Sequence, residues 1–586
     1  MEFLTPFRNG TELNQVERWK LARHPLDVYR AVIDRYAPAG PGAPAAIAAV
    51  EGEAERLKWV GIYPQRQGVD AHMLRFKVPG GRLGADQAAT IGTIADEHAR
   101  GPVENQFWGS GFCDITTRQD IQMHWIRMAD VPGIWERLER VGLTTVQACG
   151  DSARNVLGCP VAGVDRDEAF DASPAVAAIS AFFTGNRAYA NLPRKFKISV
   201  TGCVDDCAQA ELNDIGLWPA RGHQGTLGFN VLVGGGLSDG ERLASDLDVF
   251  VTLEQAVELT RAIAQVYGEL GNREHRGLCR MRYLVQELGP ERFRAELARR
   301  AAFDLVPAGE AMTRRYRGDH VGVHPQRQPG FSYVGLNVTV GRIAGTDLVE
   351  AARLARQYGD GQIRLTTDQN LVLTGVADER LDDLLAEGLL QRHSPFPGRF
   401  ERGAVACTGT EFCRFAVVET KQRMAAWAQA MDRRFPSPPR DRGKETSDEV
   451  IRLHLSGCSA SCAQPQIADI GFRGTTSVAD GRLVEAVDVG VGGSLGNDGA
   501  FLDWVTGAMP TRDAPAGIAR ILDRFEADRR PGERFHQWAR RTPHDVLYAL
   551  VAGSEPARGS TAPPSGGPRA ALAAAAEPLP ADLDQP

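Results

Sequence analysis

Four cysteines in the second half of the chain fall into two close pairs. Cys407 and Cys413 have five residues between them, and Cys458 and Cys462 have three. Four thiolates in two local pairs are what a [4Fe–4S] cluster or a tetrahedral zinc site requires. The spacings differ from the two-residue spacing usual for structural zinc and from the compact ferredoxin run. Spacing therefore predicts a thiolate-held metal centre and leaves its identity to the flanking sequence.

The first half of the chain carries a second set of four cysteines. These are Cys149, Cys159, Cys203 and Cys207. The last two repeat the three-residue spacing, so spacing alone permits a second centre. The first two have nine residues between them, and their five-residue spacing is lost. We therefore interpret this set as relics or packing residues. Cys113 and Cys279 stand alone, and we expect each to be a buried inert thiol.

The elements that must position these residues come in two copies. WVGIYPQRQG begins at Trp59, and HVGVHPQRQPG begins at His320. TGCVDDCAQAELNDIGL begins at Thr201, and SGCSASCAQPQIADIGF begins at Ser456. DITTRQDIQ and VGGGL likewise recur as RLTTDQNLV and VGGSL, in the same order and at offsets of 250 to 261 residues. A period this long predicts a gene duplication with two halves of about 250 residues rather than a solenoid.

Each half mixes the periodicities of strands and helices. Alternating or β-branched runs such as MLRFKV, FKISV and GFNVLVGG predict strands. Apolar residues at helical spacing predict helices in DQAATIGTIADEHA, DLVEAARLARQYG, residues 254–271 and residues 291–302. The fold class is therefore α+β. A surface loop is expected at 436–448, which is rich in proline and charge, and a disordered tail from about residue 552.

Composition narrows the class of protein. The 586 residues are 43% hydrophobic and 24% charged, with a net charge of −7, which gives no reason to expect a nucleic-acid partner. No apolar run approaches the roughly 20 residues that span a bilayer. The N-terminal segment is charged early and has no long apolar stretch, so we expect no secretory signal and a cytoplasmic location with reduced thiols.

The sequence around the cysteines carries a family resemblance. ACTGTEFCRFAVVETK, from Ala406, and LSGCSASCAQPQIADIGFRG, from Leu455, resemble the cluster motifs of the sirohaem-dependent nitrite and sulfite reductases. The resemblance covers roughly residues 57–547. It implies one [4Fe–4S] cluster held by the four cysteines of the second half. It also implies that Cys462 bridges this cluster to the sirohaem iron.

The same resemblance implies an anion pocket and a cofactor cradle. Its catalytic cations are Arg118 in ITTRQ, Arg154 in DSARNV, and Lys195 and Lys197 in LPRKFK. Fixed cations attract a small anion and stabilise oxygen that leaves as water. Sirohaem carries eight carboxylates, and the candidates to hold them are Arg194, Arg280 and Arg282. For Arg280 and Arg282 a solvated surface position remains an open alternative.

One asymmetry between the halves indicates a single active site. The repeat partner of Arg118 is Asp368, although Thr366, Thr367 and Gln369 repeat ITTRQ closely. The second half has thus lost the cation and kept its surroundings. We expect anion-binding groups from the first half and cluster ligands from the second.

The resemblance also implies a domain plan. Each half is expected to contain a ferredoxin-like subdomain and a sirohaem- or cluster-binding α/β subdomain. The expected boundaries are an N-terminal extension at 1–50, half-domains at 51–135 and 306–398, a sirohaem and anion-binding domain at 136–305, a cluster domain at 399–551 and a tail at 552–586.

The chain most resembles ferredoxin-dependent nitrite reductases, which implies six-electron reduction of nitrite to ammonium in a monomer. Because no segment is typical of a flavin or nicotinamide domain, electrons are expected from ferredoxin. Lys197 occupies a position where many nitrite reductases have asparagine, so ferredoxin-dependent sulfite reduction is the alternative. An electron carrier without sirohaem and a structural zinc protein are the remaining ones.

Overall fold

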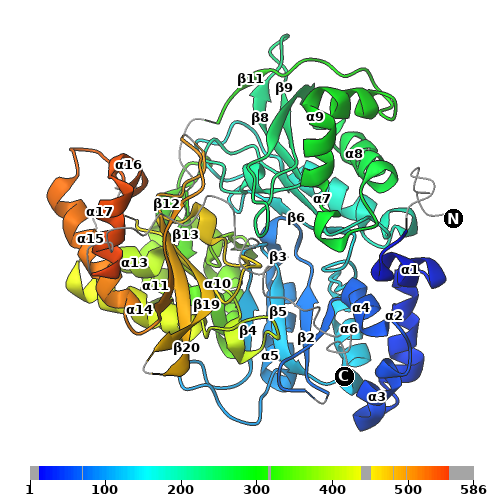
Figure 1. Cartoon of the computed structure of the whole chain (residues 1–586), viewed down its shortest axis with the longest axis horizontal. Helices are drawn as coiled ribbons and strands as arrows, with labels where there is room; N and C mark the ends of the chain where they lie inside the picture. Colours follow the sequence, from blue (N-terminus) through cyan, green and yellow to red (C-terminus); the bar gives the residue numbers. More distant parts are fainter. Residues whose placement is uncertain are drawn as a thin grey trace.

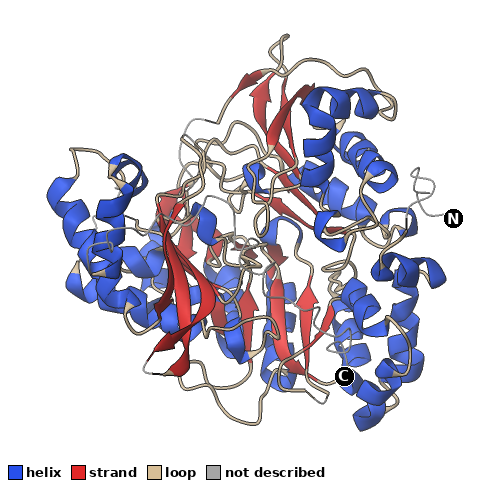
Figure 2. Ribbon diagram, viewed as in Figure 1, coloured by secondary structure: helices blue, strands red, loops and turns tan. Residues whose placement is uncertain are grey.

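The computed structural model describes residues 12–68, 70–313, 318–436, 450–479, 481–496 and 498–553. The predicted surface loop at 436–448 lies almost wholly outside these residues, as does the predicted tail beyond Gly553. The α+β class is confirmed, because the described residues form four mixed or antiparallel sheets flanked by helices (Figure 2).

Two of the sheets are built to one plan, and this repetition confirms the duplication. In each, three parallel strands are followed by antiparallel neighbours. The first-half sheet runs β10 (Ser245–Val251), β9 (Leu227–Val233), β8 (Ile215–Arg221), β7 (Phe196–Val200), β6 (Ala153–Gly158), with β11 (Glu310–Ala311) beside β8. The second-half sheet runs β17 (Ala404–Ala406), β18 (Leu453–Ser456), β19 (Ile470–Ala479), β20 (Arg482–Val491), β21 (Asp503–Pro510).

Helices cover each of these sheets and complete two separate hydrophobic cores. The first-half sheet, in the upper part of Figure 1, is packed by α7 (Ser173–Phe183), α8 (Ala256–Leu270) and α9 (Met281–Ala298). The second-half sheet is packed by α14 (Lys421–Arg434), α15 (Ala514–Asp528), α16 (Phe535–Arg541) and α17 (His544–Ala552). Both helices predicted by residues 254–271 and 291–302 are therefore confirmed, and α9 begins ten residues earlier than expected.

The two ferredoxin-like half-domains exchange a strand. The first sheet runs β1 (Ile62–Pro64), β2 (His72–Phe76), β5 (Ile121–Ile126), β4 (Phe112–Ile115), β14 (Arg342–Ala344). The second runs β12 (Gly322–Pro325), β13 (Phe331–Leu336), β16 (Leu371–Ala377), β15 (Gln362–Leu365), β3 (Arg82–Gly84). Each sheet thus ends on a strand from the other half, and one hydrophobic core serves both.

A close helix pair holds the half-domains together. α5 (Ala85–His98) of the first half packs against α10 (Gly345–Tyr358) of the second. A Cβ on Gly92 would lie 2.5 Å from the carbonyl oxygen of Gly345, so only glycine permits this approach. The two halves therefore form one body, with the two α/β domains placed around their shared core (Figure 1).

Candidate active site

The four cysteines of the second half lie on loops at one edge of the sheet. Cys407 directly follows β17, and Cys458 follows β18 after one residue. These strands are parallel neighbours, so their carboxyl ends meet at the same edge. The N–H of Gly457 donates to the sulfur of Cys407 at 3.2 Å, which fastens one cysteine loop to the other.

The four sulfurs affect one another electrostatically. Burial raises the pKa of Cys407 to about 12, and Cys462 and Cys458 add to the shift. Burial also raises the pKa of Cys458 to about 11, with contributions from Cys462 and Cys413. Among the described residues, no three of these four sulfurs belong to a group within 4.8 Å of one another. The set is therefore wider than the ligands of one ion and fits a cluster, which would displace the thiol protons.

The cations predicted from the first half converge on one place. Arg118 lies in the turn between β4 and β5, Arg154 on β6, Lys195 just before β7 and Lys197 on it. Burial lowers the pKa of Lys197 well below its usual value, and Arg118 and Lys195 lower it further. Burial, Arg280 and Arg154 together lower the pKa of Lys195 to about 7. These residues are therefore close enough to repel one another.

This group of cations faces the cysteine loops of the other half. The charge of Cys462 acts on Lys195 and on Arg75. The hydroxyl of Thr117, next to Arg118, donates to the carbonyl of Cys462 at 3.0 Å. The structure thus brings the first-half cations and the second-half cysteines close together.

The site has more positive charge than its own anions neutralise. Burial and nearby cations lower the pKa of Arg118 to about 9, although Asp120 opposes the shift. Among the described residues, the buried Nε atoms of Arg75, Arg118, Arg280 and Arg282 have no hydrogen-bond partner. A polyanion would neutralise the excess positive charge and accept hydrogen bonds from these Nε atoms. This donor set therefore fits a macrocycle that bears carboxylates.

The three arginines expected to hold the cofactor differ in their surroundings. Arg280 is buried, lies 3.2 Å from Asp214 and belongs to the cation group, so the surface alternative is wrong for it. Arg282 is buried too, but its guanidinium donates to the carbonyls of Leu237, at 2.7 Å, and Asp239, which fixes the glycine-rich loop. Arg194 is half-buried, and its Nη1 lies 3.4 Å from Asp151.

Sequence reasoning missed Arg75. It lies half-buried on β2, with Nη1 3.1 Å from the sulfur of Cys149 and Nη2 donating to Gln122 at 3.0 Å. Burial opposes the charge of Arg75, but Cys149 and other neighbours, among them Cys462, outweigh it and raise its pKa. The signal was available, because Arg75 and Lys77 alternate with apolar residues in the run MLRFKV, which predicts this strand.

Each of the two PQRQ repeats donates hydrogen bonds to a cysteine-bearing loop of the opposite half. In the first repeat, the N–H of Arg66 donates to the carbonyl of Phe412 at 3.0 Å, and its Nε donates to that of Cys413 at 3.1 Å. In the second, the N–H of Arg327 donates to the carbonyl of Val164 at 2.8 Å. The motif therefore fixes these loops in place.

These equivalent contacts correct the pairing of the first-half cysteines. Phe412 and Val164 are equivalent, and so are Cys407 and Cys159, since each cysteine directly follows the first parallel strand of its sheet. Cys149 is therefore not the partner of Cys407, because it lies before β6 beside Arg75. All four first-half cysteines are buried, as expected, and so are Cys113 and Cys279.

The chain matches two family descriptions. "Nitrite and sulphite reductase 4Fe-4S domain" matches residues 149–305 and 398–557. "Nitrite/Sulfite reductase ferredoxin-like half domain" matches residues 63–104, 106–141 and 324–389. The first description alone covers more than half of the chain, which therefore belongs to the nitrite and sulfite reductase family. It is an oxidoreductase whose cofactors are a [4Fe–4S] cluster and sirohaem.

Similar proteins cover nearly the whole chain. An assimilatory ferredoxin-dependent nitrite reductase of Haloferax mediterranei is 43% identical over 84% of this chain and 86% of the relative. A ferredoxin–nitrite reductase of Synechococcus elongatus is 38% identical over 89% and 98%. The solved structure of the Mycobacterium tuberculosis NirA protein superposes with a TM-score of 0.84, at 32% identity over 93% and 100%. No helix in the described part of the chain is long and apolar enough to cross a membrane.

Proposed function

We propose that this protein reduces nitrite to ammonium with six electrons from ferredoxin. The observation that carries the proposal is the meeting of the Arg118, Lys195 and Lys197 cations with Cys462 of the opposite half. The names of the Haloferax and Synechococcus relatives support nitrite as substrate and ferredoxin as donor. The reaction consumes eight protons and releases two waters.

We assign the cofactors to the two converging residue sets. The cluster is assigned to Cys407, Cys413, Cys458 and Cys462. Arg280, with Arg194 and Arg282 around it, is assigned to the carboxylates of sirohaem. When bound, the two cofactors supply an iron that takes the anion and a path for single electrons.

The cations of the chain itself bind the anion and supply protons. Arg118, Lys195 and Lys197 attract an anion because each is crowded by other cations. The pKa of Lys195, lowered to about 7 by burial and by Arg280, lets its Nζ give up a proton near neutral pH. Stabilising charge that builds on oxygen is the largest contribution expected of such a pocket.

Sulfite reduction is the second candidate function, and one observation favours it. Lys197 adds a second ammonium next to Lys195, and sulfite carries more negative charge than nitrite. A sulfite reductase [ferredoxin] of Mycolicibacterium paratuberculosis is 34% identical over 91% of this chain and 96% of the relative. The retained cations argue against an electron carrier that lacks sirohaem.

Steady-state kinetics with both anions tests the proposal. With reduced ferredoxin or methyl viologen as donor, kcat/KM for nitrite should exceed that for sulfite. The absorption spectrum should show the Soret and near-red bands of sirohaem. A larger kcat/KM for sulfite would make this chain a sulfite reductase, and absence of the sirohaem bands would make it an electron carrier.

Lys197→Asn is expected to lower kcat/KM for sulfite more than for nitrite. Sulfite carries up to two negative charges near neutral pH, so it gains more from a second ammonium. The selective loss should correspond to about 1–3 kcal/mol, the scale of a charge-assisted hydrogen bond. Sirohaem content, read from the Soret band, should be unchanged.

Lys195→Asn serves as the matched comparison for that prediction. The charge of Cys462 acts on Lys195, so both substrates should lose activity in this variant. Equal losses of the two substrates in Lys197→Asn would make Lys197 a general electrostatic residue. Unchanged kinetics would remove it from the pocket.

Turnover with ferredoxin is expected to weaken as salt rises. The chain is net acidic, so an acidic donor needs a local basic surface. Beside Cys413, Arg414 is exposed and Phe415 is 77% exposed, which gives a charge and an apolar anchor near the cluster ligands. Screening shortens the Debye length from about 10 Å at 0.1 M to about 3 Å at 1 M salt.

The measurement is the KM for ferredoxin at several salt concentrations, with Arg414→Ala as the test variant. This variant should start with a higher KM and show a shallower salt dependence. Its turnover with methyl viologen, which needs no docking, should equal that of the wild type. Direct turnover with NADPH by the purified chain would contradict a protein donor.

We also propose a cytoplasmic monomer. None of the ten cysteines, all of which lie among the described residues, forms a disulfide, which fits a reducing compartment. Both sides of the site come from one chain, because the two halves contribute the cations and the cysteines, so no second copy is needed to complete it.

A further inference from the structure

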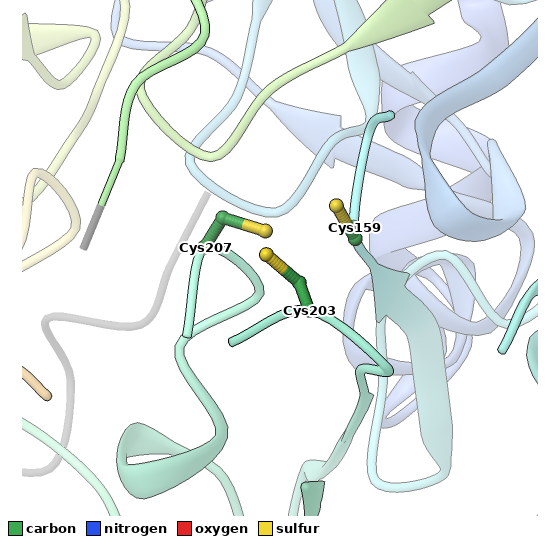
Figure 3. A group of neighbouring side chains, drawn as sticks. All are labelled: Cys159, Cys203 and Cys207. Atoms are coloured by element: carbon green, nitrogen blue, oxygen red, sulfur yellow. The ribbon is translucent and has the colours of Figure 1, made fainter. Parts of the chain in front are cut away.

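Three buried cysteines of the first half form a compact group outside the active site. The sulfurs of Cys159, Cys203 and Cys207 all lie within 4.8 Å of one another. Figure 3 shows Cys203 and Cys207 turning their sulfurs toward one another, with Cys159 beside them. Cys159 directly follows β6 and Cys203 follows β7, its parallel neighbour, so the sheet edge that gathers the cluster ligands in the second half gathers these thiols too.

The equivalence of the two halves identifies a fourth group. Cys159 corresponds to Cys407, 248 positions on, and the same offset leads from Asp165 to Cys413. The hydrogen bonds from Arg327 to Val164 and from Arg66 to Phe412 fix this alignment. A carboxylate thus stands where the second half has its fourth thiol. Its Oδ2 lies 3.9 Å from the sulfur of Cys203.

The spacing of the sulfurs decides what such a set can hold. Four ligands at about 2.3 Å around one tetrahedral ion place their sulfurs roughly 4 Å apart. The sulfurs of the triad lie within 4.8 Å of one another, close to that spacing, whereas among the described residues no three cysteine sulfurs of the second half do so. The N–H of Asp205 donates to the sulfur of Cys203 at 3.4 Å, a contact that favours a thiolate. The first-half group is therefore built for one ion rather than for four irons.

We propose that Cys159, Cys203, Cys207 and Asp165 bind one structural zinc ion or a metal ion of the same class. Thiolates select zinc over hard cations, and a closed set of four protein ligands is typical of a structural site. Binding releases the thiol protons and carries no redox step. The hydroxyl of Thr367 donates to the carbonyl of Cys207 at 2.9 Å, so the ion would stabilise a loop that contacts the second half.

One histidine near the triad competes for the fourth position. His320 is buried, and its charge acts on Cys203 and Asp165. Its Nδ1 lies 3.4 Å from the hydroxyl of Tyr333, and its Nε2 has no hydrogen-bond partner among the described residues. Both His320 and Asp165 fall outside the 4.8 Å group of ligand atoms. Asp165 occupies the position equivalent to Cys413, and its Oδ2 lies 3.9 Å from the sulfur of Cys203. We therefore assign the fourth ligand to Asp165 and a position beside the ligands to His320.

Metal analysis of the purified holoenzyme tests this proposal. The wild type should contain about one zinc ion per chain beside about five irons, four in the cluster and one in sirohaem. The double variant Cys203→Ser, Cys207→Ser should lose the zinc and keep all of the iron. Cys279→Ser, which changes a buried thiol elsewhere, should keep both. Asp165→Ala should lower zinc occupancy, and His320→Ala should not.

Several results would overturn the assignment. The assignment is wrong if the wild type holds no zinc either as purified or after incubation with zinc chloride. It is also wrong if the double variant loses about four irons, which would indicate a second cluster. A disulfide between Cys203 and Cys207, seen by mass after alkylation, would also overturn it. Should the double variant fail to fold, zinc-edge X-ray absorption of the wild type decides instead. It should show three sulfurs at about 2.3 Å and one oxygen at about 2.0–2.2 Å.

Discussion

Replacing Cys458 with alanine is expected to abolish turnover of nitrite and to remove most of the cluster iron. Cys458 lies on the loop that the N–H of Gly457 ties to the sulfur of Cys407, so its thiolate is one of four that must act together. Thiolate ligation is strong and assembly is cooperative, so three remaining ligands should not retain the cluster. Electrons from the donor would then have no path to the anion.

Iron and acid-labile sulfide per chain are the quantities to measure. Ser459→Ala provides the matched control, because Ser459 is the exposed neighbour of Cys458 on the same loop. The control should keep about four cluster irons and its absorbance. Iron and sulfide near four each in the Cys458→Ala protein would show that the ligands had been wrongly assigned.

The family motifs allowed the two halves and most of the site to be predicted. FKISV becomes β7 and places Lys195 and Lys197 at the start of a parallel strand. The lost cation at Asp368 predicts one site built from both halves, and the structure brings Lys195 close enough to Cys462 for its charge to act on the lysine. Local sequence carries this information, since each motif lies at the end of a strand whose pattern is itself recognisable.

The exchanged strands could not be predicted. β3 (Arg82–Gly84) and β14 (Arg342–Ala344) have three residues each, too few to show a period. Their partners lie in the opposite half, so pairing depends on contacts more than 200 residues apart along the chain. Such pairings are set by the shared core rather than by local preference.

The pairing of cysteines was mistaken for a related reason. The motif repeats are offset by 250 to 261 residues, whereas Cys159 and Cys407 are offset by 248. Sequence alone does not reveal a shift of a few residues between the two halves, because the strand ends are not known. Cys149 was therefore paired with Cys407. Once β6 and β17 are aligned, Asp165 falls opposite Cys413.

Asp114→Ala is expected to lower the free energy of unfolding, measured by urea titration, by about 3–5 kcal/mol, because it removes the fully buried carboxylate that neutralises neighbouring buried cations. Arg342, on the exchanged strand β14, donates from Nε to Asp114 at 2.7 Å and from Nη1 to Glu411 at 2.6 Å. The Nζ of Lys421 lies 3.8 Å from Asp114. Burial raises the pKa of Asp114, but Arg342 and Lys421 outweigh it and hold the pKa well below its usual value.

The matched control is another ion pair between the halves, at the surface. Asp86 on α5 pairs with Arg356 on α10, and the side chain of Asp86 is 86% exposed. Asp86→Ala should therefore cost at most about 1 kcal/mol in the same urea titration. Because Glu411 is two residues from Cys413, Asp114→Ala should also bleach the cluster faster in air than Asp86→Ala. Equal losses of stability in the two variants would mean that the exchanged strand is held by packing alone.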